Sequence, residues 1–237
     1  MTLDDEGRLA ELLAGTGPLL LDFDGPVCSI FAGYPAHEVA ADLREVLESN
    51  GIRVPGTMAA ESDPLEVLRW TGQLGDAHLT RVVEDALCAA ELRAARSAEP
   101  TPYAREVIVA AREAGKPVAV VSNNSPGAVV EYLELHRLSV HVPTVIGRAY
   151  AQPELMKPNP DPIRRGVSAL GAEPGDCLLI GDSLADLTAA HAAKVKVIGY
   201  ANRAEKAESF AAAGADAVVT SLSEIATSLA RLARGEI

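Results

Sequence analysis

Four short apolar runs set the limits on what this chain can fold into. Each is continuous rather than alternating, is rich in Val, Ile or Leu, and is separated from the next by helical sequence. The runs are PLLLDFD (18–24), PVAVVSN (117–123), CLLIGD (177–182) and VKVIGYA (195–201), with a weaker fifth, AVVTS (217–221). Such runs are typical of strands in a parallel sheet that is covered on both faces. Their alternation with helices predicts an α/β fold with a doubly wound parallel sheet.

The segments between these runs carry helix signals. SPGAVVEYLELHRL offers Ser125 as the N-cap and Pro126 as the first helical residue. DPIRRGVSALG places Ile163 and Val167 on one helical face and ends at Gly171, a residue type favoured just after a helix.

One long stretch breaks the alternation of strands and helices. From about residue 31 to 98 no strand is predicted, and three segments show helical periodicity: HEVAADLREVLESNG, PLEVLRWTG and DAHLTRVVEDALCAAELRAARS. We therefore expect an α/β core formed by residues 1–30 and 99–237 and an inserted helical cap domain at 31–98.

The charge of the chain limits its partners. The formal net charge is -12 over 237 residues, and such a field repels the phosphates of nucleic acid, so we expect no nucleic-acid partner. It also repels a small phosphorylated metabolite, so a phosphate site would need local positive charge. A divalent cation is the simplest source of that charge.

Cysteine use and hydropathy indicate the compartment. Cys28, Cys88 and Cys177 are far apart and form no CxxC pair, which argues against a disulfide framework and favours a reducing environment. The acidic start MTLDDEGRLAELLAG does not resemble a signal peptide, and no apolar run approaches membrane-spanning length. We expect a cytoplasmic protein without a membrane partner; the sequence favours no particular oligomeric state.

Polar residues follow three of the predicted strands. They are Asp22 and Asp24 in DFDG, Ser122 and Asn123 in VVSNNS, and Asp182 in LIGDS; Asp186 comes one turn later, and Lys157 lies in MKPNPDP. Ligands of open parallel sheets bind at the carboxyl ends of the strands. The sequence therefore predicts one site at that edge.

Asp22 and Asp24 form an i, i+2 pair whose carboxylates can point the same way. Adjacent carboxylates repel each other, and a cation held by Asp22 and Asp182 would offset that repulsion; oxygen ligands beside phosphate favour Mg²⁺. Asp22 could then attack phosphorus, with Asp24 as the general acid and base. Taken alone, DFDG is equally compatible with an ordinary turn.

The other clusters have simple alternatives too. Ser122 and Asn123 precede a helix N-terminus and can bind an anion, although a capping residue at Ser125 explains part of the pattern. Lys157 is held in a proline-rich loop that could present its ammonium group to a phosphoryl group, but most lysines are ordinary surface residues.

Asp182 and Asp186 lie four residues apart across a predicted strand-to-helix junction. Asp182 could bind a metal directly, and Asp186 could support metal-bound water or the loop. Complementarity with the positive end of the helix is the alternative, and it would account for Asp186 more easily than for Asp182.

Taken in order, DFDGPV, VVSNNS, MKPNPDP and LIGDSLADLTAA resemble the four motifs of the haloacid dehalogenase-like hydrolase superfamily. The resemblance covers residues 18–201, and the helical insertion resembles the α-helical cap of its phosphoglycolate phosphatase-like members. It implies a Rossmann-like core and a phosphatase that acts through an aspartyl-phosphate.

The resemblance also implies a role for each motif residue. Asp22 would be the nucleophile and Asp24 the general acid and base, while Ser122 and Lys157 would bind phosphate. Mg²⁺ would be held by the carboxylates of Asp22 and Asp182 and by the backbone carbonyl of Asp24.

Two features of the sequence separate the branches of this superfamily. Asp24 favours phosphatases over the dehalogenase branch, which lacks that acid. The segment 31–98 contains no lysine, which counts against phosphonate cleavage through a cap Schiff base. A phosphomutase of the same fold, which shares all four motifs, and a non-catalytic phospho-ligand-binding regulator remain alternatives.

Three arginines are candidate anion contacts, although ion pairs with nearby acids explain each of them more simply: Arg53, Arg69 and Arg148. Arg148 stands where similar proteins often carry an acidic residue, and we expect it to alter the rim of the site or the preferred anion. Lys194 replaces a glycine that usually ends the helix, and we expect only a different C-cap there.

Overall fold

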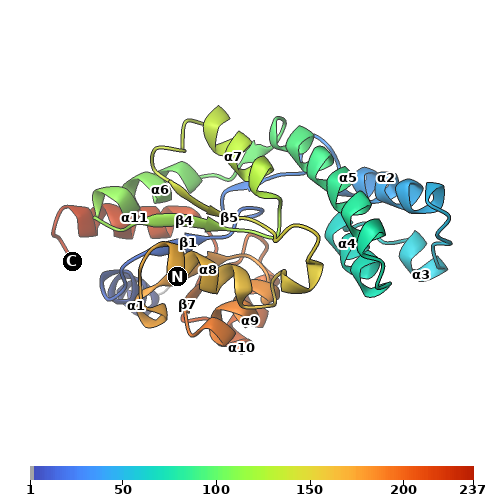
Figure 1. Ribbon diagram of the computed structural model, residues 1–237. Helices are drawn as coiled ribbons and strands as arrows, with labels where there is room; N and C mark the ends of the chain where they lie inside the picture. The colour runs from blue at the N-terminus through green and yellow to red at the C-terminus, as the bar shows by residue number, and fades with distance from the viewer. Residues whose placement is uncertain (1–2) are drawn as a thin grey trace.

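The computed structural model, which describes residues 3–237, contains a six-stranded parallel sheet (Figure 1). The strand order is β5-β4-β1-β6-β7-β8, and β1 lies between β4 and β6: Leu20 pairs with Ala119 on one side and with Leu179 on the other. The strands are β1 (Leu19–Leu21), β4 (Val118–Val121), β5 (Thr144–Ile146), β6 (Leu178–Gly181), β7 (Lys196–Tyr200) and β8 (Ala217–Val219). The predicted doubly wound α/β fold is confirmed.

Each of the five apolar runs contains one of these strands, but β5 was not predicted. Its three residues are all half-buried, and it pairs only with β4 at the edge of the sheet. A three-residue edge strand has too little apolar sequence to stand out from a loop.

Helices cover both faces of the sheet (Figure 1). One face packs against α1, α6, α7 and α11, and the other against α8, α9 and α10. These helices are α1 (Leu3–Ala14), α6 (Ala104–Glu113), α7 (Pro126–Leu135), α8 (Asp161–Ala169), α9 (Leu184–Ala193), α10 (Lys206–Ala212) and α11 (Leu222–Ala233); η1 (Pro153–Leu155) and η2 (Pro174–Asp176) are short 3₁₀ helices. Strand side chains alternate between the two cores, as Leu19 and Leu21 face one and Leu20 the other.

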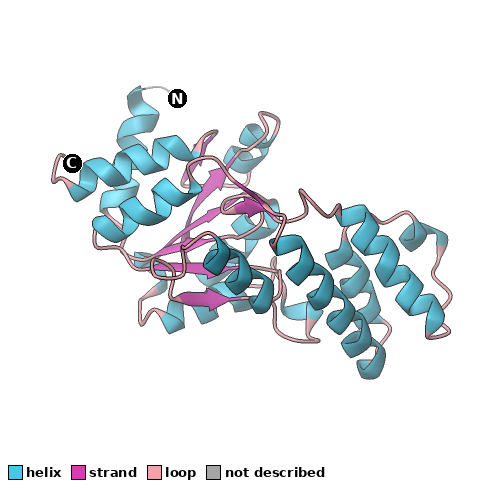
Figure 2. Cartoon of the chain, turned by 90° about the horizontal axis from the view of Figure 1, so that it is seen from above, coloured by secondary structure: helices cyan, strands magenta, loops and turns pink. Residues whose placement is uncertain are grey.

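Residues 31–98 form a separate group of helices beside the sheet (Figures 1 and 2). The helices are α2 (Ala36–Ser49), α3 (Gly56–Ala59), α4 (Pro64–Gln73) and α5 (Ala77–Ala95). Their apolar faces make a core of their own, with Leu43, Leu68 and Leu87 fully buried. The three predicted helical segments correspond to α2, α4 and α5. This group is called the helical insertion below.

A two-stranded antiparallel ribbon closes the base of the helical insertion. It pairs β2 (Cys28–Ser29) with β3 (Glu99–Pro100), just outside the range 31–98. The chain therefore leaves and re-enters the α/β core at adjacent points. None of the helices in the described part of the chain is both long and apolar enough to cross a membrane.

The helix ends near the sheet edge agree with those predicted from the sequence, with one difference. Ser125 occupies the N-cap position of α7 and Pro126 is its first residue, but the Ser125 side chain makes no capping hydrogen bond. Lys194 ends α9 in the left-handed conformation, with φ of 62°, and so takes the place of a C-cap glycine as expected.

Candidate active site

The strand order brings the predicted site residues together. Because β4, β1 and β6 are neighbours and parallel, the segments that follow them meet at one edge of the sheet. They line a cavity of about 520 Å³ that also borders the helical insertion. All but one of the predicted site residues line this cavity: Asp22, Asp24, Ser122, Asn123, Lys157 and Asp182. The exception, Asp186, lies beneath it, fully buried.

Lys157 lies at the centre of the site. Its Nζ is 2.7 Å from Oδ1 of Asp22 and 2.6 Å from Oδ1 of Asp186, and it donates to the carbonyl oxygen of Val121 at 3.1 Å. Burial alone would lower the pKa of Lys157, but the two carboxylates outweigh burial and raise it, so the ammonium group stays charged. The proline-rich loop thus presents a fixed cation to the end of β1.

Asp22 is held in an environment that disfavours its charge. Burial raises its pKa well above the ordinary value, and Asp186 and Asp182 raise it further, while Lys157 lowers it. The Phe23 N–H donates to Oδ1 of Asp22 at 2.7 Å, which fixes that oxygen. An added cation would relieve the remaining repulsion.

Asp24 differs from Asp22 in its surroundings. One oxygen accepts the Ile30 N–H at 3.0 Å, while the residue is exposed towards the cavity. Desolvation by nearby protein atoms, together with Asp182 and Asp63, raises the pKa of Asp24 to about 6. A carboxyl group with this pKa can both give and accept a proton near neutral pH.

Asp186 has two partners, one for each oxygen. Oδ1 binds Lys157, and Oδ2 accepts from the Ser183 hydroxyl at 2.6 Å and the Ser183 N–H at 3.1 Å, which completes a capping box at the start of α9. Asp186 therefore lies at the start of α9, where its negative charge complements the helix end, and also holds the side chain of Lys157.

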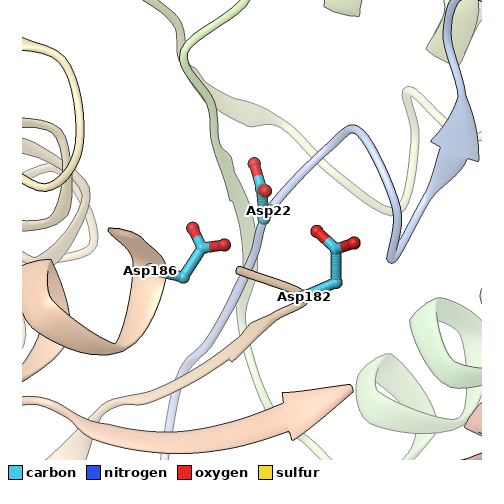
Figure 3. A group of neighbouring side chains, drawn as sticks. All are labelled: Asp22, Asp182 and Asp186. Atoms are coloured by element: carbon cyan, nitrogen blue, oxygen red, sulfur yellow. The ribbon is translucent and has the colours of Figure 1, made fainter. Parts of the chain in front are cut away.

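The carboxylates of Asp22, Asp182 and Asp186 face a common space (Figure 3). Ligand oxygens from all three lie within 4.8 Å of one another. Both oxygens of Asp186 are taken by Lys157 and Ser183, whereas Asp22 and Asp182 each pair through one oxygen only, so Asp22 and Asp182 are the carboxylates best placed to share a cation. Carboxylate oxygens are hard ligands of the kind that Mg²⁺ binds.

Asp182 has partners that the sequence did not reveal. Oδ2 of Asp182 lies 2.8 Å from Nζ of Lys206 and 3.0 Å from Nδ2 of Asn202. Burial raises the pKa of Asp182, and Lys206 partly offsets this. Asn202 lies in the β7–α10 connection and Lys206 is the first residue of α10, and neither carries a motif that would have indicated it.

Asn123 contributes differently from a simple anion-binding side chain. Its Nδ2 donates to the Lys157 carbonyl oxygen at 3.1 Å, and its Oδ1 accepts the Lys157 N–H at 2.8 Å. The side chain therefore fixes the Lys157 loop. Within the described part of the chain the main-chain N–H of Asn123 has no hydrogen-bond partner, and it can bind an anion together with the hydroxyl of Ser122.

The helical insertion supplies the opposite wall of the cavity through Asp63, Leu65, Glu66 and Arg69 near the start of α4. Arg69 pairs with Glu66 at 3.1 Å and donates to the Lys157 carbonyl oxygen at 3.2 Å. The two acids were not singled out from the sequence, because exposed acidic residues at a helix start are common.

The expected place of Arg148 at the rim is wrong, and the simpler ion-pair explanation is confirmed. Arg148 is buried away from the rim, with its guanidinium group paired to Glu84 and Glu91 of α5. Arg53 is exposed and does not line the cavity. Of the three candidate arginines, only Arg69 borders the site.

Comparison with known sequences agrees with this geometry. The sequence profile of the haloacid dehalogenase-like hydrolases matches residues 19–194. A phosphoglycolate phosphatase of Cupriavidus necator is 36% identical over 133 residues, which is 53% of this chain and 54% of that protein. The pyrophosphatase PpaX of Halalkalibacterium halodurans is 30% identical over 109 residues, covering 45% of this chain and 50% of that protein. The matched region is about half the length of these curated relatives.

Solved structures share the fold at low sequence identity. A predicted phosphatase from Clostridium acetobutylicum superimposes with a TM-score of 0.68 at 18% identity, covering 90% of this chain and 97% of that one. A hydrolase from Deinococcus radiodurans, solved with bound phosphate and sodium, gives a TM-score of 0.61 at 23% identity, with 92% and 97% coverage. These likenesses extend over the helical insertion as well as the sheet.

Proposed function

Because the chain belongs to the haloacid dehalogenase-like hydrolases, we propose that it is a magnesium-dependent phosphatase acting on a small phosphorylated metabolite. The observation that carries this proposal is the contact between Asp22 and Lys157, 2.7 Å apart in the cavity that also holds Asp24 and Asp182. A nucleophile, a cation for the phosphoryl group and a proton donor are thus gathered at one point.

In this proposal Asp22 attacks phosphorus and the bond to the leaving oxygen breaks. Asp24 gives its proton to the departing alkoxide, so that an alcohol and an aspartyl-phosphate result. Asp24 then takes a proton from a water molecule, which attacks the aspartyl-phosphate and releases inorganic phosphate. The pKa of about 6 for Asp24 suits both steps.

The remaining residues bind and orient. Lys157, the Ser122 hydroxyl and the Asn123 N–H would hold the phosphoryl oxygens, and Asp186 would keep Lys157 in place. The carboxylates of Asp22 and Asp182 and the backbone carbonyl of Asp24 would hold Mg²⁺. When bound, that ion supplies positive charge that offsets the phosphoryl oxygens and the paired carboxylates.

We assign residues 31–98 as a cap domain on a core of residues 1–30 and 99–237. The assignment is supported by the separate core of the helical insertion and by the narrow ribbon of β2 and β3 at its base. Asp63, Glu66 and Arg69 would face the leaving group, so the cap would exclude water and select the substrate. The relatives named for phosphoglycolate place small phosphate esters first among candidates.

The test is hydrolysis of an aryl phosphate with and without Mg²⁺ by the wild-type chain and by Asp22→Asn. We expect turnover that requires Mg²⁺ and that falls at least about 10³-fold in the variant, the scale of losing a nucleophile. Asp176→Asn is the matched control, since Asp176 is exposed and lies before β6 rather than after it. Near-normal turnover by folded Asp22→Asn would overturn the covalent mechanism, and phosphate binding without turnover would favour a regulator.

A further inference from the structure

A buried cluster of charges joins the helical insertion to the core behind the candidate site. The Arg148 guanidinium lies 2.7 Å from Oε1 of Glu84 and 2.9 Å from Oε1 of Glu91, and none of the three side chains is more than 2% exposed. Burial lowers the pKa of Arg148, but the two glutamates raise it overall, so the guanidinium group stays charged. Burying three charges is costly and calls for an explanation beyond stability.

The cluster is connected to the main chain of the proposed phosphate loop, residues 122–125. Arg148 Nη1 donates to the carbonyl oxygen of Asn123 at 2.6 Å. Oε2 of Glu91 accepts the Ser125 N–H at 2.9 Å. Both contacts therefore hold main-chain groups of the loop rather than its side chains.

A second connection reaches the Ser122 side chain. Oε1 of Glu91 accepts from Nδ2 of Asn124 at 3.1 Å. Asn124 in turn holds the Ser122 hydroxyl, donating its N–H to Oγ at 3.0 Å and accepting from Oγ through Oδ1 at 3.1 Å. Contacts thus run without a gap from Arg148 through Glu91 and Asn124 to Ser122.

The glutamates come from α5, the helix that leads from the helical insertion back to the core (Figure 1). An apolar contact would have been enough to pack α5 against the core. The desolvated hydrogen bonds instead fix the direction of individual peptide groups in the loop.

We propose that Arg148, Glu84 and Glu91 are positioning residues that hold the phosphate loop in its anion-binding shape, so that phosphate affinity depends on α5. The inference rests on the proposed function, because it assumes that residues 122–125 bind phosphate. Coupling of this kind is reciprocal: phosphate in the loop must stabilise the contacts of α5 by the same amount.

The first experiment measures binding of inorganic phosphate, in the presence of Mg²⁺, to the full chain and to Glu91→Gln and Arg148→Met. We expect the Kd for phosphate to rise about tenfold or more, the scale on which a group that orients a ligand acts. Arg148→Lys should restore only part of the lost phosphate affinity, since lysine lacks the planar guanidinium group that reaches Glu84, Glu91 and Asn123.

The matched control is Arg96→Met, which removes an exposed ion pair between the end of α5 and α7 at 2.8 Å from Glu131. It should leave the Kd for phosphate unchanged. Binding of Mn²⁺ to the proposed metal site separates a loss of phosphate-loop positioning from general damage to the site. The proposed metal ligands Asp22 and Asp182 lie on other loops, so Glu91→Gln should keep the wild-type affinity for Mn²⁺. Equal phosphate affinity in wild type and Glu91→Gln, or equal loss of both affinities, would overturn the inference.

A second measurement uses only the wild-type chain and so holds even if the variants do not fold. Saturating phosphate should slow hydrogen–deuterium exchange in the part of α5 around residues 84–91, and not in α2. Unchanged exchange in α5 would overturn the coupling. A wild-type chain that hydrolyses aryl phosphate but shows no coupling would refute this inference alone, whereas one that neither binds phosphate nor hydrolyses the ester would refute the proposed function as well.

Discussion

The Cα of Gly25 packs directly against the carboxylate of Asp182. A Cβ atom on Gly25 would lie 2.4 Å from Cγ of Asp182, and Gly25 has a φ of 108°, in the region that favours glycine. The turn after β1 and the end of β6 therefore fit together only when residue 25 has no side chain. This contact limits where the carboxylate of Asp182 can lie relative to the turn that follows Asp22.

Gly25→Ala should therefore weaken metal binding. The new methyl group would be strained by the backbone conformation, at a cost of about 1–3 kcal/mol, and would push Asp182 aside. We expect a higher Kd for Mg²⁺ and lower turnover, measured by metal titration and by aryl phosphate hydrolysis. The control is Gly175→Ala, where a Cβ meets nothing within 4 Å. Wild-type Mg²⁺ affinity in Gly25→Ala would show that the close fit is not needed.

The raised pKa of Asp24 should make the metal-free protein less stable as pH rises. The group ionises near pH 3.8 when unfolded and at about 6 when folded, so the folded state binds more protons between these values. The stability it contributes is complete below pH 3.8 and is lost as pH rises through 6.

Urea denaturation in EDTA at pH 4 to 7 measures this loss. In Asp24→Asn the free energy of unfolding should fall less steeply as pH rises. The remaining fall should come from Asp22 and Asp182, whose pKa values are also raised. If the wild-type chain and Asp24→Asn lose stability equally over this range, Asp24 does not ionise as the structure indicates.

Mg²⁺ should stabilise the folded chain, because it offsets the repulsion between Asp22 and Asp182. At a concentration of 100 times Kd, binding to the folded state alone adds about 2.7 kcal/mol. The thermal unfolding midpoint should rise with Mg²⁺ in the wild-type chain and much less in Asp182→Asn. An equal rise in Asp182→Asn would place the ion elsewhere.

The sequence predicted the sheet well because each central strand is a continuous buried run, and buried parallel strands need apolar residues on both faces. The sequence did not predict β5, because its three half-buried residues resemble those of a loop. The site residues could be placed because parallel strands end at one edge. Arg148 could not be placed, since its partners Glu84 and Glu91 lie more than fifty residues away, and a sequence gives no sign of which distant charges pair.

The pairing of Lys157 with both Asp22 and Asp186 gives a prediction that separates stability from chemistry. Asp186 is fully buried, so Lys157→Met would leave it without its cation. Breaking a buried ion pair on one side costs about 3–5 kcal/mol, and Lys157→Met should be destabilised on that scale in urea denaturation.

The double variant Lys157→Met with Asp186→Asn should recover much of this stability. Asparagine keeps an oxygen that can accept from Ser183 but carries no charge to leave unpaired. Turnover should stay abolished in the double variant, because the proposed phosphate ligand is still missing. Asp161→Asn, which loses only an exposed pair with Arg165, should give no recovery when combined with Lys157→Met. If the double variant is no more stable than Lys157→Met, the cost does not come from an unpaired Asp186, and Lys157 supports the fold through other contacts.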